Sequence, residues 1–304
     1  MVRDSRDDSR RNQLQKILKS VGGFLGSLLS LAGLWYLLDY IERIDLASQL
    51  AILDGTRILA ISGLTTILAA ANGLVALSWR TILADFGGDI SSVHAQLLFS
   101  WTNLLKYVPG NIVHVAGRQI LTMRAGVPGW AVAKSLTMEI ILLVLSSLTF
   151  AGIVWLLPQI VGMNGVYLSL ALLLAAASSV LFLQWMGLRG SAWASLGYWA
   201  YHLIGGIVFA LLFVVLGAGI DHFRIFWFLI IAYVASWVLG MLTPGSPAGL
   251  GVREATLIGL LQHSVQDQAM LGAAVLLSRG MSVFADITYF LVLRCWSFCN
   301  QHTD

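Results

Sequence analysis

The sequence predicts an all-α, polytopic membrane protein with about six transmembrane helices and two re-entrant hairpins. Three observations predict this fold class. Hydrophobic residues make up 58% of the 304-residue chain and charged residues 11%, whereas about a quarter of a soluble domain is charged. Apolar runs of about 20 residues, the length that a span needs, recur along the chain. Two of the apolar regions are interrupted by a Pro-Gly pair, which favours a helix that breaks and turns back.

The chain begins with a basic, charge-rich leader over residues 1–20, followed by an apolar run over 21–38. A secretory signal peptide is the alternative, but the long charged leader and the lack of a small-x-small cleavage site favour a retained first helix. The positive-inside rule then predicts a cytoplasmic N-terminus in the cytoplasmic (inner) membrane. The acidic loop over 39–57 suits the outer side.

The first half of the membrane region continues with spans over 58–79 and 130–157. Between them lies the first broken segment, about 95–124. Its leading arm is too short to cross a membrane, so we expect a hairpin that dips in from the cytoplasm. An uncharged loop over 158–165 is expected to end this half outside.

The second half is expected to hold spans over 166–186, 195–217 and 269–293, with a second broken segment at about 225–265. The leading arm of that segment, 225–242, is about 18 residues long and could nearly cross. Re-entry from the outside and a complete crossing therefore both remain open.

Re-entry is preferred because it gives the two halves one plan, three spans with a hairpin between the second and the third. Residues 21–160 and 161–304 would then form two membrane repeats of opposite orientation, the inverted-repeat plan of many transporters. This repeat is a hypothesis, since outside the Pro-Gly motifs the halves share little sequence.

The two breaks follow the same spacing, with nine residues from proline to arginine in each half. Proline ends a helix and glycine permits a reversal of the backbone. Broken helices persist in a membrane only where protein buries them or where they line a water-filled cavity. Matching breaks in two halves of a chain point to a binding site. The break residues are Pro109, Gly110 and Gly117, and Pro244, Gly245 and Gly251.

Seven charged residues fall at membrane depth: Lys106, Arg118, Glu139, Arg253, Glu254, Arg279 and Asp286. A charge there costs about 2.5–3.5 kcal/mol on insertion scales, so it is retained where it is paired or lines an aqueous path. One interpretation is purely structural: Arg118 pairs with Glu139, and Arg279 pairs with Asp286 or Glu254.

The other interpretation is that the four cations converge on an anion. The guanidinium fork binds two phosphate oxygens at once, and open helix N-termini after each Pro-Gly pair would add N–H donors. Phosphate on a lipid head group is the anion expected inside a membrane. Tyr107 and Asn111, with Asn103 and His114, either bind head-group hydroxyls or satisfy the broken backbone.

The residues before and after the breaks resemble a known family. Lys106 to Asn111 read K-Y-V-P-G-N and lead to Gly117-Arg118, which is similar to the K-Y-x-P-G-x…G-R signature of the lysylphosphatidylglycerol synthase transmembrane region, or flippase-like domain family. Pro244-Gly245 and the run from Gly249 to Glu254 resemble its P-G-G-x-G-x-R-E signature. Glu139 and Arg279 also match family positions, whereas Ser246-Pro247-Ala248 departs from the glycines usual there.

The resemblance implies two re-entrant hairpins from opposite faces and a role in moving lipids. In bifunctional members a soluble domain aminoacylates the lipid, and this chain is expected to lack that activity. No catalytic constellation, metal-ligand set or cofactor motif is recognised, so an enzyme is not expected. Cys295 and Cys299 are expected to be inert thiols.

We therefore expect a flippase or transporter for an anionic, phosphate-bearing lipid or a polyprenyl-phosphate-linked glycan. The alternative is a non-transporting membrane partner that presents lipid to, or scaffolds, an envelope glycan or lipid biosynthetic enzyme. A lipid, and not a nucleic acid, is the expected ligand. The identity of the lipid, its direction of movement and the oligomeric state stay open.

Overall fold

The computed structural model describes residues 27–107, 113–161, 165–218 and 223–301. All regular elements within these ranges are helices, and six of them are long and apolar enough to cross a membrane. The prediction of an all-α polytopic membrane protein is therefore confirmed. Pro109, Gly110 and Asn111, with the turn of the first hairpin, lie outside the described residues, as does the leader.

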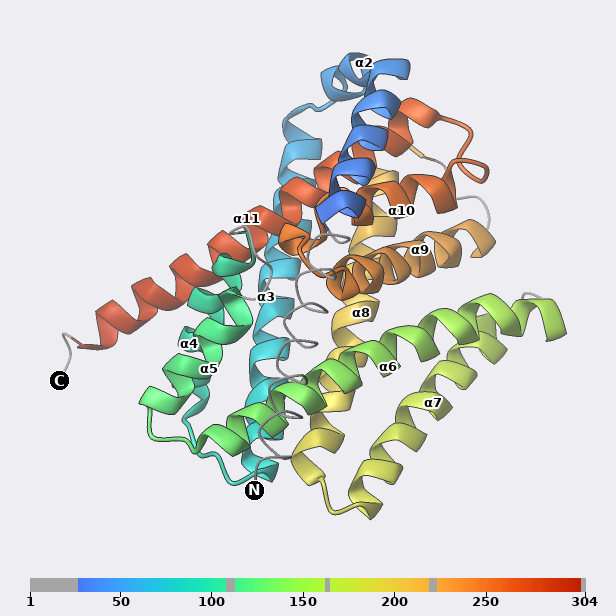
Figure 1. Ribbon diagram of the computed structural model, residues 1–304. Helices are drawn as coiled ribbons and strands as arrows, with labels where there is room; N and C mark the ends of the chain where they lie inside the picture. The colour runs from blue at the N-terminus through green and yellow to red at the C-terminus, as the bar shows by residue number, and fades with distance from the viewer. Residues whose placement is uncertain (1–26, 108–112, 162–164, 219–222, 302–304) are drawn as a thin grey trace, which may run out of the picture.

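Apart from the short helix α2, the elements before and after residue 162 follow one order (Figure 1). The first half holds a helix over residues 27–43, then α2 (Leu46–Ala51), α3 (Gly55–Asp85), α4 (Ser92–Leu104), the 3₁₀ turn η1 (Leu105–Tyr107), α5 (Val113–Arg124) and α6 (Gly129–Val161). The second half holds α7 (Gly165–Trp185), α8 (Arg189–Val215), α9 (Phe223–Leu242), η2 (Pro247–Gly249), α10 (Val252–Leu261) and α11 (Gln268–Gln301).

Several boundaries differ from the sequence-based expectation: the first helix continues to residue 43, α8 begins at Arg189, and α11 continues to Gln301. The helix α6 continues past residue 158 to Val161, so the first half of the expected outer loop is helical. A proline removes one hydrogen bond and kinks a helix without always ending it. The acidic loop after the first helix also contains the short helix α2.

The centre of the bundle is the packing of α3 against α8. Two glycines of α8 make this close approach possible. A Cβ atom on Gly190 would collide with the carbonyl oxygen of Thr81, and one on Gly197 would collide with the hydroxyl of Ser78. Since the two glycines are seven residues apart, they lie on one face of α8, and α3 rests along that face.

The hairpin formed by α4 and α5 enters and leaves at one end of the bundle. At the end of α3, Asp85 accepts hydrogen bonds from the backbone N–H groups of Gly190 (2.8 Å) and Ser191 (2.6 Å) at the start of α8. Gly88, before α4, lies against Val127, which precedes α6. Both ends of this hairpin therefore lie at what we call the Asp85 end.

The hairpin formed by α9 and α10 enters and leaves at the opposite end. Gly217, after α8, lies close to the guanidinium of Arg57 at the start of α3. Tyr40 donates its hydroxyl to the carbonyl of Gln268, where α11 begins (2.9 Å). Because α3 has 31 residues and is about 46 Å long, this Arg57 end is remote from the Asp85 end. The chain thus returns to the side from which α9 started, as the re-entry alternative requires.

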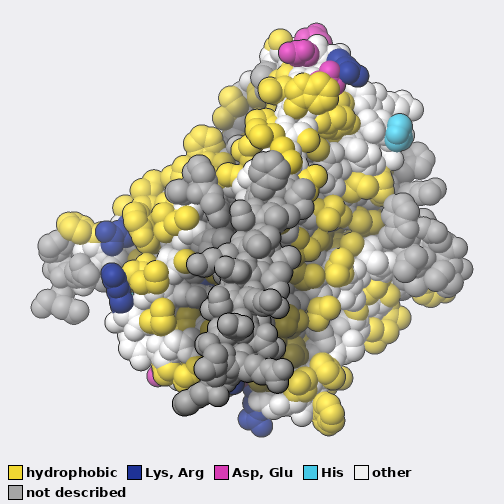
Figure 2. All heavy atoms as spheres, viewed as in Figure 1, with side chains coloured by type: hydrophobic (Ala, Val, Ile, Leu, Met, Phe, Trp, Pro, Cys, Tyr) yellow, Lys and Arg dark blue, Asp and Glu magenta, His cyan; other side chains and the backbone are white. Residues whose placement is uncertain are grey.

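The surface divides into an apolar flank and charged ends. Figure 2 shows hydrophobic side chains along the flank and acidic and basic side chains gathered over α2. Among the candidate spans α8 is the most buried, and α7 is the least. The outer helices thus present an apolar band of the kind that faces lipid.

The glycine contacts between α3 and α8 can be tested by substitution. Gly190→Ala should lower the free energy of unfolding by about 1–3 kcal/mol, because the new methyl group meets backbone that cannot move aside. The matched control is Gly63→Ala on α3, where no atom lies within 4 Å of the added carbon; it should be neutral or stabilising by up to about 1 kcal/mol. Unfolding of the detergent-solubilised protein measures both, and equal stability of the two variants would contradict this packing.

Candidate functional site

The described inner ends of the two hairpins, which we call their tips, contact one another. The 3₁₀ turns η1 and η2 contact one another, and α11 packs against both α4 and α10 (Figure 1). Arg279 and Asp286, both on α11, are seven residues apart and share a face. Each of these two side chains holds one hairpin.

Asp286 holds the first hairpin. One carboxylate oxygen accepts hydrogen bonds from the amides of Asn72 on α3 (2.9 Å) and Asn103 on α4 (2.8 Å). The other accepts from the hydroxyl of Tyr107 (2.5 Å) and pairs with the ammonium of Lys106 (2.7 Å). The carboxylate is 3% exposed, so these four donors, and not bulk water, stabilise its charge.

Arg279 holds the second hairpin. Its Nη1 donates to the carbonyl of Ala248 in η2 (2.9 Å), and its Nε lies 3.5 Å from Glu254. The other carboxylate oxygen of Glu254 accepts from the N–H of Gly251 at the start of the same helix (2.7 Å). This corrects the expectation of an open helix N-terminus in the second hairpin, since Glu254 already occupies one of its donors.

The turn of the second hairpin depends on glycines and a strained alanine. The helix α9 ends before Pro244, as the sequence predicts. Ala248 has φ +50°, a left-handed conformation that is uncommon for residues other than glycine. Gly251 has φ +84°, and a Cβ atom there would collide with the backbone of the first helix at Ser30. The first helix therefore lies directly behind the start of α10.

Arg253 is the one cation of the predicted set for which the described residues contain no acidic partner within salt-bridge distance. It is 8% exposed, and its guanidinium carbon lies 4.7 Å from the centre of the Tyr233 ring. Its Nη2 atom has no hydrogen-bond partner, and neither has the Nη2 atom of Arg279. An unpaired buried donor costs about 1–3 kcal/mol, and more when it is charged, so we treat these two atoms as a candidate anion site.

Arg118 does not join this group. It pairs with Glu139 on α6, and its guanidinium carbon lies 4.8 Å from the Trp79 ring and 5.2 Å from the Phe99 ring. The preceding Gly117 lies against Leu105, so α5 can approach the end of α4. The pairs expected under the structural interpretation, Arg118 with Glu139 and Arg279 with Glu254, are both present. Convergence of the cations on an anion stays a prediction.

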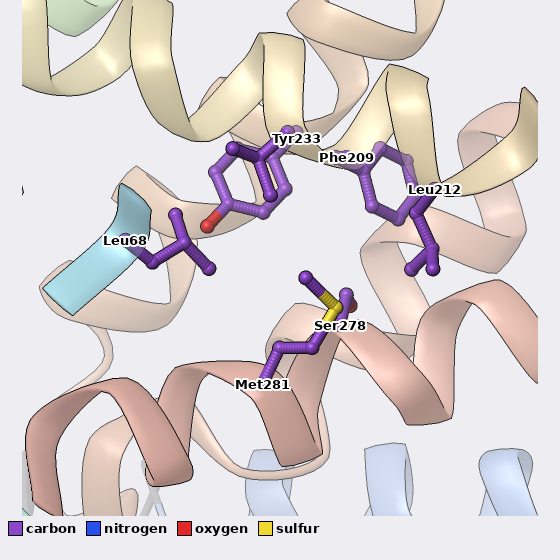
Figure 3. A pocket seen from close by; sticks show the side chains of 7 residues that line it. Leu68, Phe209, Leu212, Tyr233, Ser278 and Met281 are labelled. Atoms are coloured by element: carbon purple, nitrogen blue, oxygen red, sulfur yellow. The ribbon is translucent and has the colours of Figure 1, made fainter. Parts of the chain in front are cut away.

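Tyr233, whose ring faces Arg253, also lines a narrow apolar crevice (Figure 3). Its wall comes from four helices: Leu68 of α3, Val208, Phe209 and Leu212 of α8, Tyr233 of α9, and Ser278 and Met281 of α11. The space is too narrow for a water molecule. The bundle is thus closed at this point.

Sequence reasoning missed two contributors to the site. Asn72 is an amide in the middle of an otherwise apolar span, and that contrast could have identified it. Tyr233 gives no comparable signal, since an aromatic residue in a span is common. Asn103 and Tyr107, which were considered as ligands of head-group hydroxyls or of backbone, donate instead to Asp286. The Nδ1 atom of His114 is buried without a partner.

Comparison with known proteins adds no relative from which a function could be transferred. No family model, curated protein or solved structure matches the chain. The resemblance to the lysylphosphatidylglycerol synthase transmembrane region thus stays a prediction from the motifs. The function has to be argued from the geometry of the site.

The Arg118–Glu139 pair can be tested by a double-mutant cycle. Glu139→Gln or Arg118→Met alone should lower the free energy of unfolding by about 3–5 kcal/mol, because each leaves a buried charge without its partner. The double variant should lose clearly less than the sum of the two. Denaturation of the purified protein in mixed micelles measures the cycle, and additive losses would show that the two charges do not stabilise one another.

Proposed function

We propose that the protein translocates a lipid with an anionic, phosphate-bearing head group across the cytoplasmic membrane. The observation that carries the proposal is the pair of buried guanidinium groups, Arg253 and Arg279, each with an unpartnered Nη2 atom. A phosphate group would supply the oxygens that these donors lack, and arginine binds phosphate through two parallel hydrogen bonds. In the proposed complex the phosphate bridges the two arginines, while the hydrocarbon chains stay in the surrounding lipid.

The architecture supports movement from one face to the other. One hairpin enters and leaves at the Asp85 end and the other at the Arg57 end. Their tips contact each other, and Arg279 binds the tip of the second hairpin. Withdrawal of one tip would expose the site to one face while the other tip keeps it closed. This is the alternating access of transporters built from inverted repeats.

The remaining charges of the tips have supporting roles in this proposal. Asp286 and Lys106 hold the first hairpin on α11, and Glu254 orients Arg279 and the start of α10. The resemblance to the flippase-like domain family favours the same function. The basic leader favours a cytoplasmic N-terminus, which would make the Asp85 end cytoplasmic.

The competing hypothesis is a membrane partner that presents lipid to a biosynthetic enzyme without moving it. Purified protein in vesicles distinguishes the two, because a translocator acts there alone and a partner does not. Glycerol 3-phosphate and inorganic phosphate, added as competitors, separate a lipid site from a site for a free anion. Competition at low concentration by either one would argue for a soluble substrate.

Translocation is tested with phosphatidylglycerol that carries a fluorophore on an acyl chain, in vesicles of phosphatidylcholine. Arg253→Gln and Arg279→Gln should each slow the protein-dependent movement by about 10- to 100-fold, because a hydrogen bond to a charged group contributes about 1.5–3 kcal/mol. Bleaching of the outer leaflet by dithionite measures the rate.

The matched control is Arg43→Gln, which removes an exposed arginine paired with Asp39 at the end of the first helix and should move lipid at the parental rate. If both site variants also retain the parental rate, the two arginines do not bind the head group. If the parent moves no lipid while it still binds phosphatidylglycerol, the presenting partner is the better description.

A further inference from the structure

The acidic groups at the hairpin tips are already occupied by donors of the protein itself. Asp286 accepts from four donors, and a carboxylate offers about four lone-pair sites. Glu254 is 4% exposed and is committed to Arg279 and to the N–H of Gly251. The sites of Asp286 are therefore filled, and Glu254, with two donors, is kept from an incoming cationic group by its burial.

Among the five charged side chains at the hairpin tips, the atoms without a partner belong to cations. The tip cluster holds three cations, Lys106, Arg253 and Arg279, against two acids, so its net charge is +1. Within the described residues, its partnerless side-chain atoms are the two guanidinium Nη2 atoms. A ligand with one negative charge would make the cluster neutral, whereas an added ammonium would face cations without an available counter-charge.

From this pattern we infer that the site selects phosphodiester lipids whose head group carries no ammonium, such as a polyol or glycan phosphate, over zwitterionic lipids such as phosphatidylethanolamine. The inference rests on the head-group site of the proposed function and adds its substrate class. Lys106 is the residue that enforces the selection, because it occupies the place on Asp286 that a substrate ammonium would need.

The role of Lys106 gives a test by gain of function. Lys106→Met frees one oxygen of Asp286 and lowers the net charge of the cluster from +1 to 0, which suits a zwitterion with its phosphate on the arginines and its ammonium on Asp286. The matched control is Lys106→Arg, which keeps a cation on Asp286 and the net charge of +1. The control should therefore keep the selectivity of the parent.

Two readouts separate selection from translocation. The first is the affinity of the detergent-solubilised protein for phosphatidylglycerol and for phosphatidylethanolamine, measured by the thermal shift that each lipid produces. The second is the rate at which acyl-labelled forms of both lipids move in phosphatidylcholine vesicles. The parent should prefer phosphatidylglycerol by at least about tenfold, equivalent to 1.4 kcal/mol.

In Lys106→Met the preference should fall severalfold through tighter binding of phosphatidylethanolamine, whereas in Lys106→Arg it should persist. Equal affinity of the parent for the two lipids would overturn the inference and leave translocation standing. A parent that binds selectively but moves neither lipid would overturn translocation and leave the selectivity standing. If Lys106→Met does not fold, the parental affinities alone decide between selection and its absence.

Discussion

The buried carboxylate of Asp286 is the interaction on which the arrangement of the helices depends. It joins α3, the tip of the first hairpin and α11 through four donors. A charge at membrane depth is costly, and here the cost is offset because each lone pair has a partner. Two turns earlier on α11, Arg279 binds the carbonyl of Ala248 in the other tip. One face of one helix thus sets the positions of both hairpins.

The close packing of the spans makes this geometry possible. The glycines of α8 let α3 approach until backbone touches side chain, so the second span of one half lies directly on the second span of the other. Gly251 similarly admits the first helix behind the start of α10. Because small residues bring the backbones together, the short hairpins can reach the centre of the bundle and bury their broken backbone within protein.

The sequence predicted the fold better than it predicted the site, for a physical reason. Apolar runs and Pro-Gly breaks are local signals, and the hairpins and most spans lie where these signals put them. Which charges pair depends on packing between distant segments. Arg118 and Arg253 occupy equivalent places nine residues after a proline, but Arg118 meets Glu139 on α6 and Arg253 meets the ring of Tyr233. Spacing alone could not separate a paired arginine from an unpaired one.

The different attachment of the two tips has a consequence for the proposed transport. A ligand shifts a conformational equilibrium only by its differential affinity for the two states. Two parallel hydrogen bonds from Arg279 to a phosphate need Nη2 and one neighbouring nitrogen, Nη1 or Nε. The phosphate would therefore displace either the carbonyl of Ala248 or Glu254, and would thereby weaken the attachment of the second hairpin. The first hairpin depends on Asp286, whose donors do not include either arginine of the anion site. Head-group binding would therefore loosen the tip that opens to the Arg57 end while the other tip stays in place, which gives the two halves unequal roles despite their common plan.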